Sequence, residues 1–261
     1  MGFLGLFSGG SGLSEKAIAK QAKMATNQFA QPEMRREAMD RLVKDGTPAA
    51  IAGLLTRFTI NATGEIADEE EKTWLERTLV DLGEVSINPI REYIAREKNL
   101  TYPINSLFKL QPEEEVLSFL VGVLDSYGPE DHRSGEIKLQ IIYQIEEHDK
   151  GKFLPSLVPY LQDHDDDVRL AVLDIFDRAR YKGFVNKETA ALVAKELAPQ
   201  VLDEEFSPRV QQRVAAFLCK AEWALPDNGK SELIPSLSGH YYLDKKRFVR
   251  ELAPQARTDN K

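Results

Sequence analysis

The feature that most constrains the fold of this chain is a helical hydrophobic pattern that recurs in paired segments. In DHDDDVRLAVLDIF (residues 163–176) and the residues just after it, apolar side chains recur at helical spacing, at Val168, Ala171, Val172, Ile175, Phe176 and Ala179. A second amphipathic helix is predicted upstream, with Pro155 in its first turn and apolar positions Leu154, Leu157, Val158 and Leu161. Two antiparallel helices joined by an acidic turn therefore form one unit.

The same pairing recurs along the chain. Downstream, a helical face over residues 190–201 precedes a helix in which Ser207 is the predicted N-cap and Pro208 the first residue. Upstream, helix pairs are predicted over residues 14–30 with 32–46, 47–58 with 68–83, 86–99 with 102–110, and 111–128 with 134–149. Comparable landmarks of the second helices imply a repeat of about 30–40 residues, at Arg36, Trp74, Lys138, Arg169 and Arg209. We therefore expect an all-α fold, a right-handed α-solenoid of about five to six antiparallel helix pairs.

These segments carry a family resemblance. LPSLVPYLQDHDDDVRLAVLDIF resembles a HEAT repeat of the short type found in phycobilisome lyases, through its acidic turn, then Asp167-Val168-Arg169, then Ala171. SPRVQQRVAAFL and PEMRREAMDRL are weaker matches. The resemblance covers residues 150–222 and extends back to about residue 30, and it implies that Arg169 has a structural role in pairing adjacent repeats. It implies a fold rather than a function, because HEAT repeats are reused in many roles.

We expect three regions: a flexible apolar segment and linker over residues 1–12, the repeats over 13–222, and a C-terminal cap or tail over 223–261. The first region carries Phe3, Leu4, Leu6 and Phe7, which could dock on a partner, on the first repeat, or weakly on a membrane surface. It lacks the positive start of a secretory signal, and no apolar run is long enough to span a membrane, so we expect a cytoplasmic protein. The net charge of -8 argues against nucleic-acid binding.

The four aspartates of residues 163–167 raise the question of a metal site. Asp163, Asp165 and Asp167 have the spacing that opens a calcium loop, but Val168 and Asp174 stand where such a loop needs Gly and Glu. Helix capping by Asp165 or Asp166 is the simpler interpretation. The acidic stretch DEEEKTWLE (68–76) is likewise interpreted as a helix N-terminus. We predict no metal, cofactor or catalytic site.

Two further segments are candidate partner-binding sites. The turn at residues 126–140 is long and chemically mixed, and its candidate residues are Tyr127, Asp131, His132, Arg133 and Lys138. The segment 239–252 is basic and aromatic, and its candidates are Tyr241, Tyr242, Arg247 and Phe248. A solvated connector and a terminal cap are the respective alternatives.

We expect a non-catalytic scaffold or adaptor that binds another protein along the concave face lined by the second helices. Residues 111–150 hold ten acids and three bases, a net charge of -7, which favours a partner with a basic or helical surface. One alternative is a phycobilin-lyase-like protein or its helper subunit, which handles a chromophore. A second alternative is a HEAT-like DNA-repair glycosylase, which would need a basic concave face.

Overall fold

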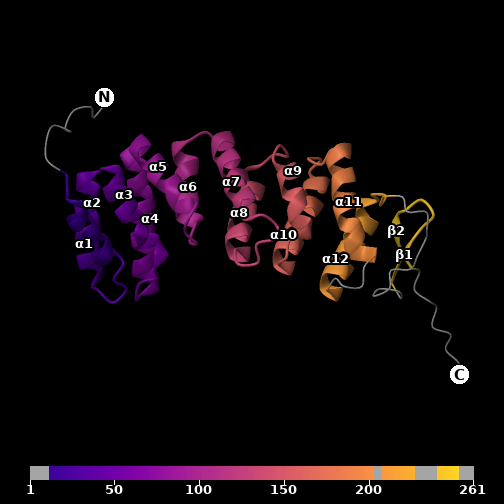
Figure 1. Cartoon of the computed structure of the whole chain (residues 1–261), viewed down its shortest axis with the longest axis horizontal. Helices are drawn as coiled ribbons and strands as arrows, with labels where there is room; N and C mark the ends of the chain where they lie inside the picture. Colours follow the sequence, from indigo (N-terminus) through magenta and orange to yellow (C-terminus); the bar gives the residue numbers. More distant parts are fainter. Residues whose placement is uncertain (1–11, 203–206, 227–239, 253–261) are drawn as a thin grey trace, which may run out of the picture. The chain divides into compact units, whose positions relative to one another are not determined.

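The computed structural model describes residues 12–202, 207–226 and 240–252, which are mostly helical (Figure 1). The chain packs into two units, one up to Val116 and one from Leu117 onward, so the division falls inside helix α7. The elements of the first part are α1 (Glu15–Ala25), α2 (Pro32–Asp45), α3 (Pro48–Leu55), the 3₁₀ helix η1 (Thr56–Thr59), α4 (Glu65–Leu82), η2 (Gly83–Ser86), α5 (Ile87–Ile94), α6 (Thr101–Leu110) and α7 (Glu113–Tyr127). Those of the second are α8 (Gly135–His148), α9 (Leu154–Leu157), η3 (Val158–Gln162), α10 (Asp166–Tyr181), α11 (Lys187–Leu202), α12 (Pro208–Ala221), β1 (Tyr241–Leu243) and β2 (Val249–Glu251).

Within each unit the helices lie in two rows. In the first unit, α1, α3 and α5 pack side by side, and α2, α4 and α6 form the other row. In the second unit, α8, α10 and α12 form one row, while η3 and α11 pack together beside it. We call α2, α4 and α6, and separately α8, α10 and α12, the second-helix rows. Four of the predicted helix pairs pack together, namely α1 with α2, α5 with α6, η3 with α10, and α11 with α12.

Polar side chains set where several helices begin. Ser14 and Thr47 accept hydrogen bonds from the amides of Ala17 and Ala50, both at 3.3 Å, at the starts of α1 and α3. Ser207 accepts from the amide of Val210 at 3.4 Å, and Pro208 follows it, as predicted. Gly46 caps the C-terminus of α2, and its φ of 64° is left-handed, which suits a glycine. Capping thus divides a continuous helical pattern into short elements.

The predicted helix over residues 154–161 is shorter than expected. α9 comprises only four residues, and the chain continues as the 3₁₀ helix η3. Pro159 has no amide hydrogen, so it cannot donate to the carbonyl of Pro155 as an α-helix requires. Val158 donates to that carbonyl instead, which is the tighter 3₁₀ pattern.

A two-stranded hairpin lies near the C-terminus, where the sequence predicted no strands. β1 and β2 are antiparallel, with Leu243 opposite Val249, and both of these side chains are buried. β2 packs against α12. At the turn, the Asp244 carboxylate accepts the amides of Lys246 and Phe248, at 2.8 and 2.9 Å. This aspartate replaces the Asn-Gly or Asp-Gly pair that would have signalled a hairpin in the sequence.

Candidate functional site

A buried ion cluster fixes α4 against its neighbours in the first unit. Glu71 of α4 accepts from Arg35 of α2 at 2.8 Å, and from the Nε of Arg57 in η1 at 2.9 Å. Arg57 also donates to Asp68 at 2.5 Å, and Asp68 pairs with Lys72 at 2.7 Å. The side chains of both arginines are 0% exposed, so the guanidinium groups are held entirely within the chain. The acidic stretch 68–76 is therefore more than the helix N-terminus that the sequence suggested, because two of its carboxylates are buried partners.

On the solvent side of this cluster, α2 and α4 are joined by an aromatic contact. The guanidinium carbon of Arg36 lies 3.6 Å from the centre of the Trp74 ring, a cation–π distance. The Nε of Arg36 also lies 3.2 Å from the Asp40 carboxylate, so its charge is balanced on its own helix. Arg36 and Trp74, which mark second helices in the sequence, thus contact each other between two neighbouring helices of the second-helix row.

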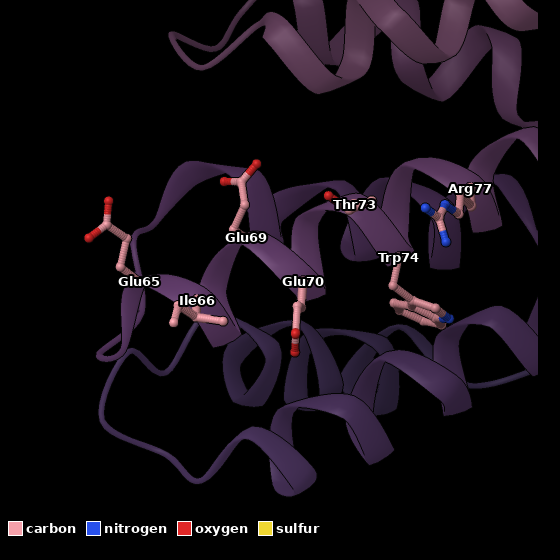
Figure 2. Close-up of a pocket in the computed structure, with 7 residues that line it drawn as sticks. All are labelled: Glu65, Ile66, Glu69, Glu70, Thr73, Trp74 and Arg77. Carbon is pink, nitrogen blue, oxygen red and sulfur yellow. The ribbon is translucent and has the colours of Figure 1, made fainter.

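Two adjoining hollows lie on this face. The first, of about 600 Å³, runs along α4, and Figure 2 shows its side chains rising from successive turns of that helix: Glu65, Ile66, Glu69, Glu70, Thr73, Trp74 and Arg77. The second, of about 410 Å³, lies between the first halves of α2 and α4, and its lining includes Pro32, Glu33, Arg36, Ala67 and Glu70. The two hollows share Glu70. We call them together the α2/α4 groove.

Several carboxylates of this groove have no ionic partner. Within the described ranges, Glu33, Glu65 and Glu70 form no ion pair, although all three are exposed. Neighbouring carboxylates are engaged: Glu69 accepts the hydroxyl of Tyr102, and Glu76 pairs with Lys109. Burial first and then the Glu69 carboxylate raise the pKa of Tyr102 to about 12, which keeps that phenol protonated. The groove therefore carries negative charge that the chain itself leaves unbalanced.

Exposed apolar side chains lie at the same end of the groove. Ile66, in the first turn of α4, is 79% exposed, and Met34, in the first turn of α2, is 50% exposed. Phe29, in the loop before α2, is 78% exposed. The loops before α2 and before α4 are joined, because the Thr63 amide donates to the Gln28 carbonyl at 3.1 Å. Of these three, Ile66 lines the groove itself.

The second-helix row of the second unit also has ion pairs between helices, and these lie among exposed or half-exposed side chains. Arg178 of α10 donates to Glu146 of α8 at 2.8 Å. Arg213 of α12 lies 2.5 Å from Asp174 of α10. Another pair joins the same two helices, since Arg209 lies 2.9 Å from Asp167. These three pairs join α8 to α10 and α10 to α12, whereas Glu33, Glu65 and Glu70 of the α2/α4 groove form no ion pair in the described ranges.

The predicted binding turn at residues 126–140 is held together by Lys138. Its ammonium is fully buried and donates to the Asp163 carboxylate at 2.5 Å and to the Asp131 carbonyl at 2.8 Å. Lys138 therefore has a structural role, and its prediction as a partner-binding residue is wrong. Around it, the Asp131 carboxylate accepts the Arg133 amide at 2.8 Å, and the rings of His132 and His164 lie 5.5 Å apart. Tyr127 ends α7. A role in binding for these four residues stays a prediction.

Two of the four aspartates at residues 163–167 are a buried partner and a helix cap. Asp163 is the partner of Lys138, and burial, outweighing the hydrogen bonds from Lys138 and the Asp165 amide, raises its pKa. Asp165 is the N-cap of α10, since its carboxylate accepts the Asp167 amide at 2.8 Å, as one of the predicted alternatives has it. Arg169 lies 2.9 Å from Asp166 on its own helix. In the described ranges, no three His, Cys, Asp or Glu side chains gather as metal ligands.

The predicted residues of segment 239–252 lie in the hairpin. Arg247, at the turn, is only 6% exposed and donates to the Pro226 carbonyl at 3.1 Å, so the structure corrects its assignment as a contact residue. Its φ of 67° is left-handed. Tyr241, Tyr242 and Phe248 are half-buried, and their contact with a partner stays a prediction. Phe3, Leu4, Leu6 and Phe7 lie outside the described residues.

The residues of the α2/α4 groove were not singled out as a site in the sequence, where Trp74 served only as a repeat landmark. A signal was present: residues 65–66, 69–70, 73–74 and 77 recur at helical spacing and mix carboxylates with Ile66 and Trp74. The pattern could not show which carboxylates would be paired.

None of the described helices has the length and apolar character needed to cross a membrane. Comparisons of the chain with models of protein families, with curated proteins and with solved structures found no match, so its function is inferred from its own residues.

Proposed function

We propose that this protein is a non-catalytic adaptor that binds another protein along its second helices. In this proposal the helix pairs form a right-handed solenoid of five to six HEAT-like repeats, with the second helices on the concave side. Stacked helix pairs of this kind present an extended surface that suits a helix or a peptide of a partner. The binding site that we assign is the α2/α4 groove.

One observation carries the proposal: the groove combines unbalanced carboxylates with exposed apolar side chains. Glu65 and Glu70 form no ion pair in the described part of the chain, and Ile66 between them is 79% exposed. Holding charge and apolar surface in water stabilises nothing within the chain itself. Covering both features with a complementary surface lowers the free energy of the complex.

The same charges disfavour the nucleic-acid alternative. Glu33, Glu65 and Glu70 on the groove repel phosphates, whereas a HEAT-like glycosylase needs a basic face. No contact in the described residues favours the lyase-like alternative. A change in the absorption spectrum of free bilin on mixing with the protein would support that alternative over the adaptor.

Site-specific photocrosslinking tests the adaptor function. Arg77 is exposed at the end of the groove, and a photoreactive phenylalanine analogue at this position should form a covalent adduct with a discrete protein in the native cell. The matched control places the analogue at Glu92, an exposed residue of α5 in the first row, where no such adduct is expected. Absence of an adduct from position 77, or an identical adduct from both positions, would contradict the proposal.

A further inference from the structure

We propose that the occupant of the α2/α4 groove is a cationic amphipathic segment of a partner protein, with Lys or Arg side chains one helical turn apart and an apolar side chain between them. This inference rests on the adaptor function proposed above and adds the chemistry of the partner. It also moves the expected basic contact away from residues 111–150, where the sequence had placed it, to the first unit.

The spacing of the carboxylates sets the spacing of the cations. Glu65 and Glu69 are four residues apart on α4, one turn or about 6 Å of helix, and Glu70 extends to the opposite side of α4 from Glu69 (Figure 2). Glu33 of α2 faces the same groove from the other wall. Two ammonium or guanidinium groups at one-turn spacing would meet Glu65 and Glu69, and a third would meet Glu70 and Glu33. Because the groove is open to water, such pairs favour association speed and specificity more than affinity.

The apolar side chains of the groove call for an apolar side chain on the occupant. Ile66 lies between the carboxylates in the first turn of α4, and Trp74 follows two turns later on the same face. Trp74 already has a guanidinium against its ring, that of Arg36, which shows that this indole accommodates a cation as well as an apolar group. Burial of an isoleucine and a tryptophan supplies the affinity that exposed ion pairs lack.

The far end of the groove gives the occupant a direction. Arg77 is exposed and forms no ion pair in the ranges that the structure describes. It lies twelve residues after Glu65, about 18 Å along α4. A segment that places its cations at the Glu65 end and an acidic residue or its C-terminal carboxylate near Arg77 satisfies both ends. The occupant therefore spans about three helical turns and has one preferred direction.

Trp74 itself can report on the occupant. The chain has two tryptophans, and Trp223 lies in the second unit, where its ring meets Phe217 at 5.3 Å between ring centres. In the full-length Trp223→Phe variant, the remaining tryptophan fluorescence comes from the groove. The probe is a synthetic helix of about 14 residues with a free C-terminal carboxylate, built from Leu, Ala and Lys with Lys at one-turn spacing, and its partner probe carries Gln in place of each Lys.

We expect a saturable change of Trp74 fluorescence with the Lys peptide and none with the Gln peptide. Affinity should fall as salt is raised from about 50 mM to about 500 mM, because screening weakens exposed pairs. Glu65→Gln with Glu70→Gln should weaken binding by about three- to tenfold, which corresponds to two exposed pairs. The control variant Glu15→Gln with Glu92→Gln removes two exposed carboxylates of the first row and should bind as before. Calorimetry on the unaltered chain repeats the titration should Trp223→Phe impair folding.

The possible outcomes separate this inference from the adaptor function. Equal binding of the Lys and Gln peptides, or no effect of removing Glu65 and Glu70, overturns the cationic occupant. If position 77 still crosslinks a protein in that case, the adaptor function stands and only the partner chemistry is wrong. If the crosslink is also absent, both fail. A Trp74 response to vesicles of anionic phospholipid, without a response to the Lys peptide, would overturn the inference in favour of a membrane surface.

Discussion

Two adjacent glutamates show how much the surroundings of a residue decide its role. Glu71 is 8% exposed in its side chain and bridges two fully buried arginines, while Glu70 is exposed on the groove. In the sequence they are two letters of one acidic run. Only the packing of α2 and η1 against α4 makes one a buried partner and leaves the other exposed to solvent.

Replacement of Glu71 should therefore destabilise the first unit strongly. We expect Glu71→Ala to lower the free energy of unfolding by about 3–5 kcal/mol, because Arg35 and Arg57 would keep buried charges without this carboxylate. The matched control, Glu70→Ala, should change it by about 0.5 kcal/mol or less. Urea unfolding followed by circular dichroism measures both. Similar losses for the two variants would contradict the assignment of the buried cluster.

The pKa of Asp68 predicts how the stability of this unit depends on pH. Desolvation raises the pKa of Asp68, but hydrogen bonds from Lys72, the Ala62 amide and Arg57 lower it further, and the net shift is downward. A carboxyl with a lowered folded-state pKa contributes stability above its unfolded pKa, near 4, and loses it as the pH falls through the folded value. We expect the stability gap between the unaltered chain and Asp68→Asn to shrink below about pH 4. A gap that stays constant from pH 7 to about pH 2 would rule out this contribution.

At the scale of the element, the helices of the second-helix row depend on their buried faces. Val168 of α10 and Phe217 of α12 are both 0% exposed. We expect Val168→Asp and Phe217→Asp each to cost about 3–5 kcal/mol and to unfold the C-terminal helix pairs, because a charge would be buried without a partner. Thermal melts followed by circular dichroism test this. Melting temperatures that stay unchanged in both variants would contradict the assigned helix faces.

The elements could largely be predicted from the sequence because helical spacing and caps are local signals. Ser207 with Pro208, and Asp165 before α10, mark helix starts by the chemistry of their own side chains. The hairpin was missed because each strand has three residues and its turn is closed by Asp244. The α2/α4 groove was missed for another reason: whether Glu70 has a partner depends on residues distant in sequence.

At the scale of the whole molecule, residues 1–12 stand apart because their sequence lacks the helical pattern of the repeats. Phe3, Leu4, Leu6 and Phe7 precede a Gly/Ser-rich stretch. We expect deletion of residues 1–12 to leave helical content and melting temperature nearly unchanged, and to weaken association with the partner or with an anionic membrane. Circular dichroism and liposome sedimentation measure the two effects. A drop of several degrees in melting temperature with association intact would instead show that this segment stabilises the first repeat.

The contrast between the two second-helix rows has a consequence for how a cell could regulate this protein. Ion pairs such as Arg213–Asp174 are exposed links that stabilise their row by about 0–1 kcal/mol each, so a change of ionic strength alters folding only slightly. Under the proposed function, the same change in ionic strength would act on the α2/α4 groove by weakening the bound partner. Release of that partner would then require no unfolding: a local rise in salt, or a neutralising modification of the partner's lysines, would detach it and leave the protein folded.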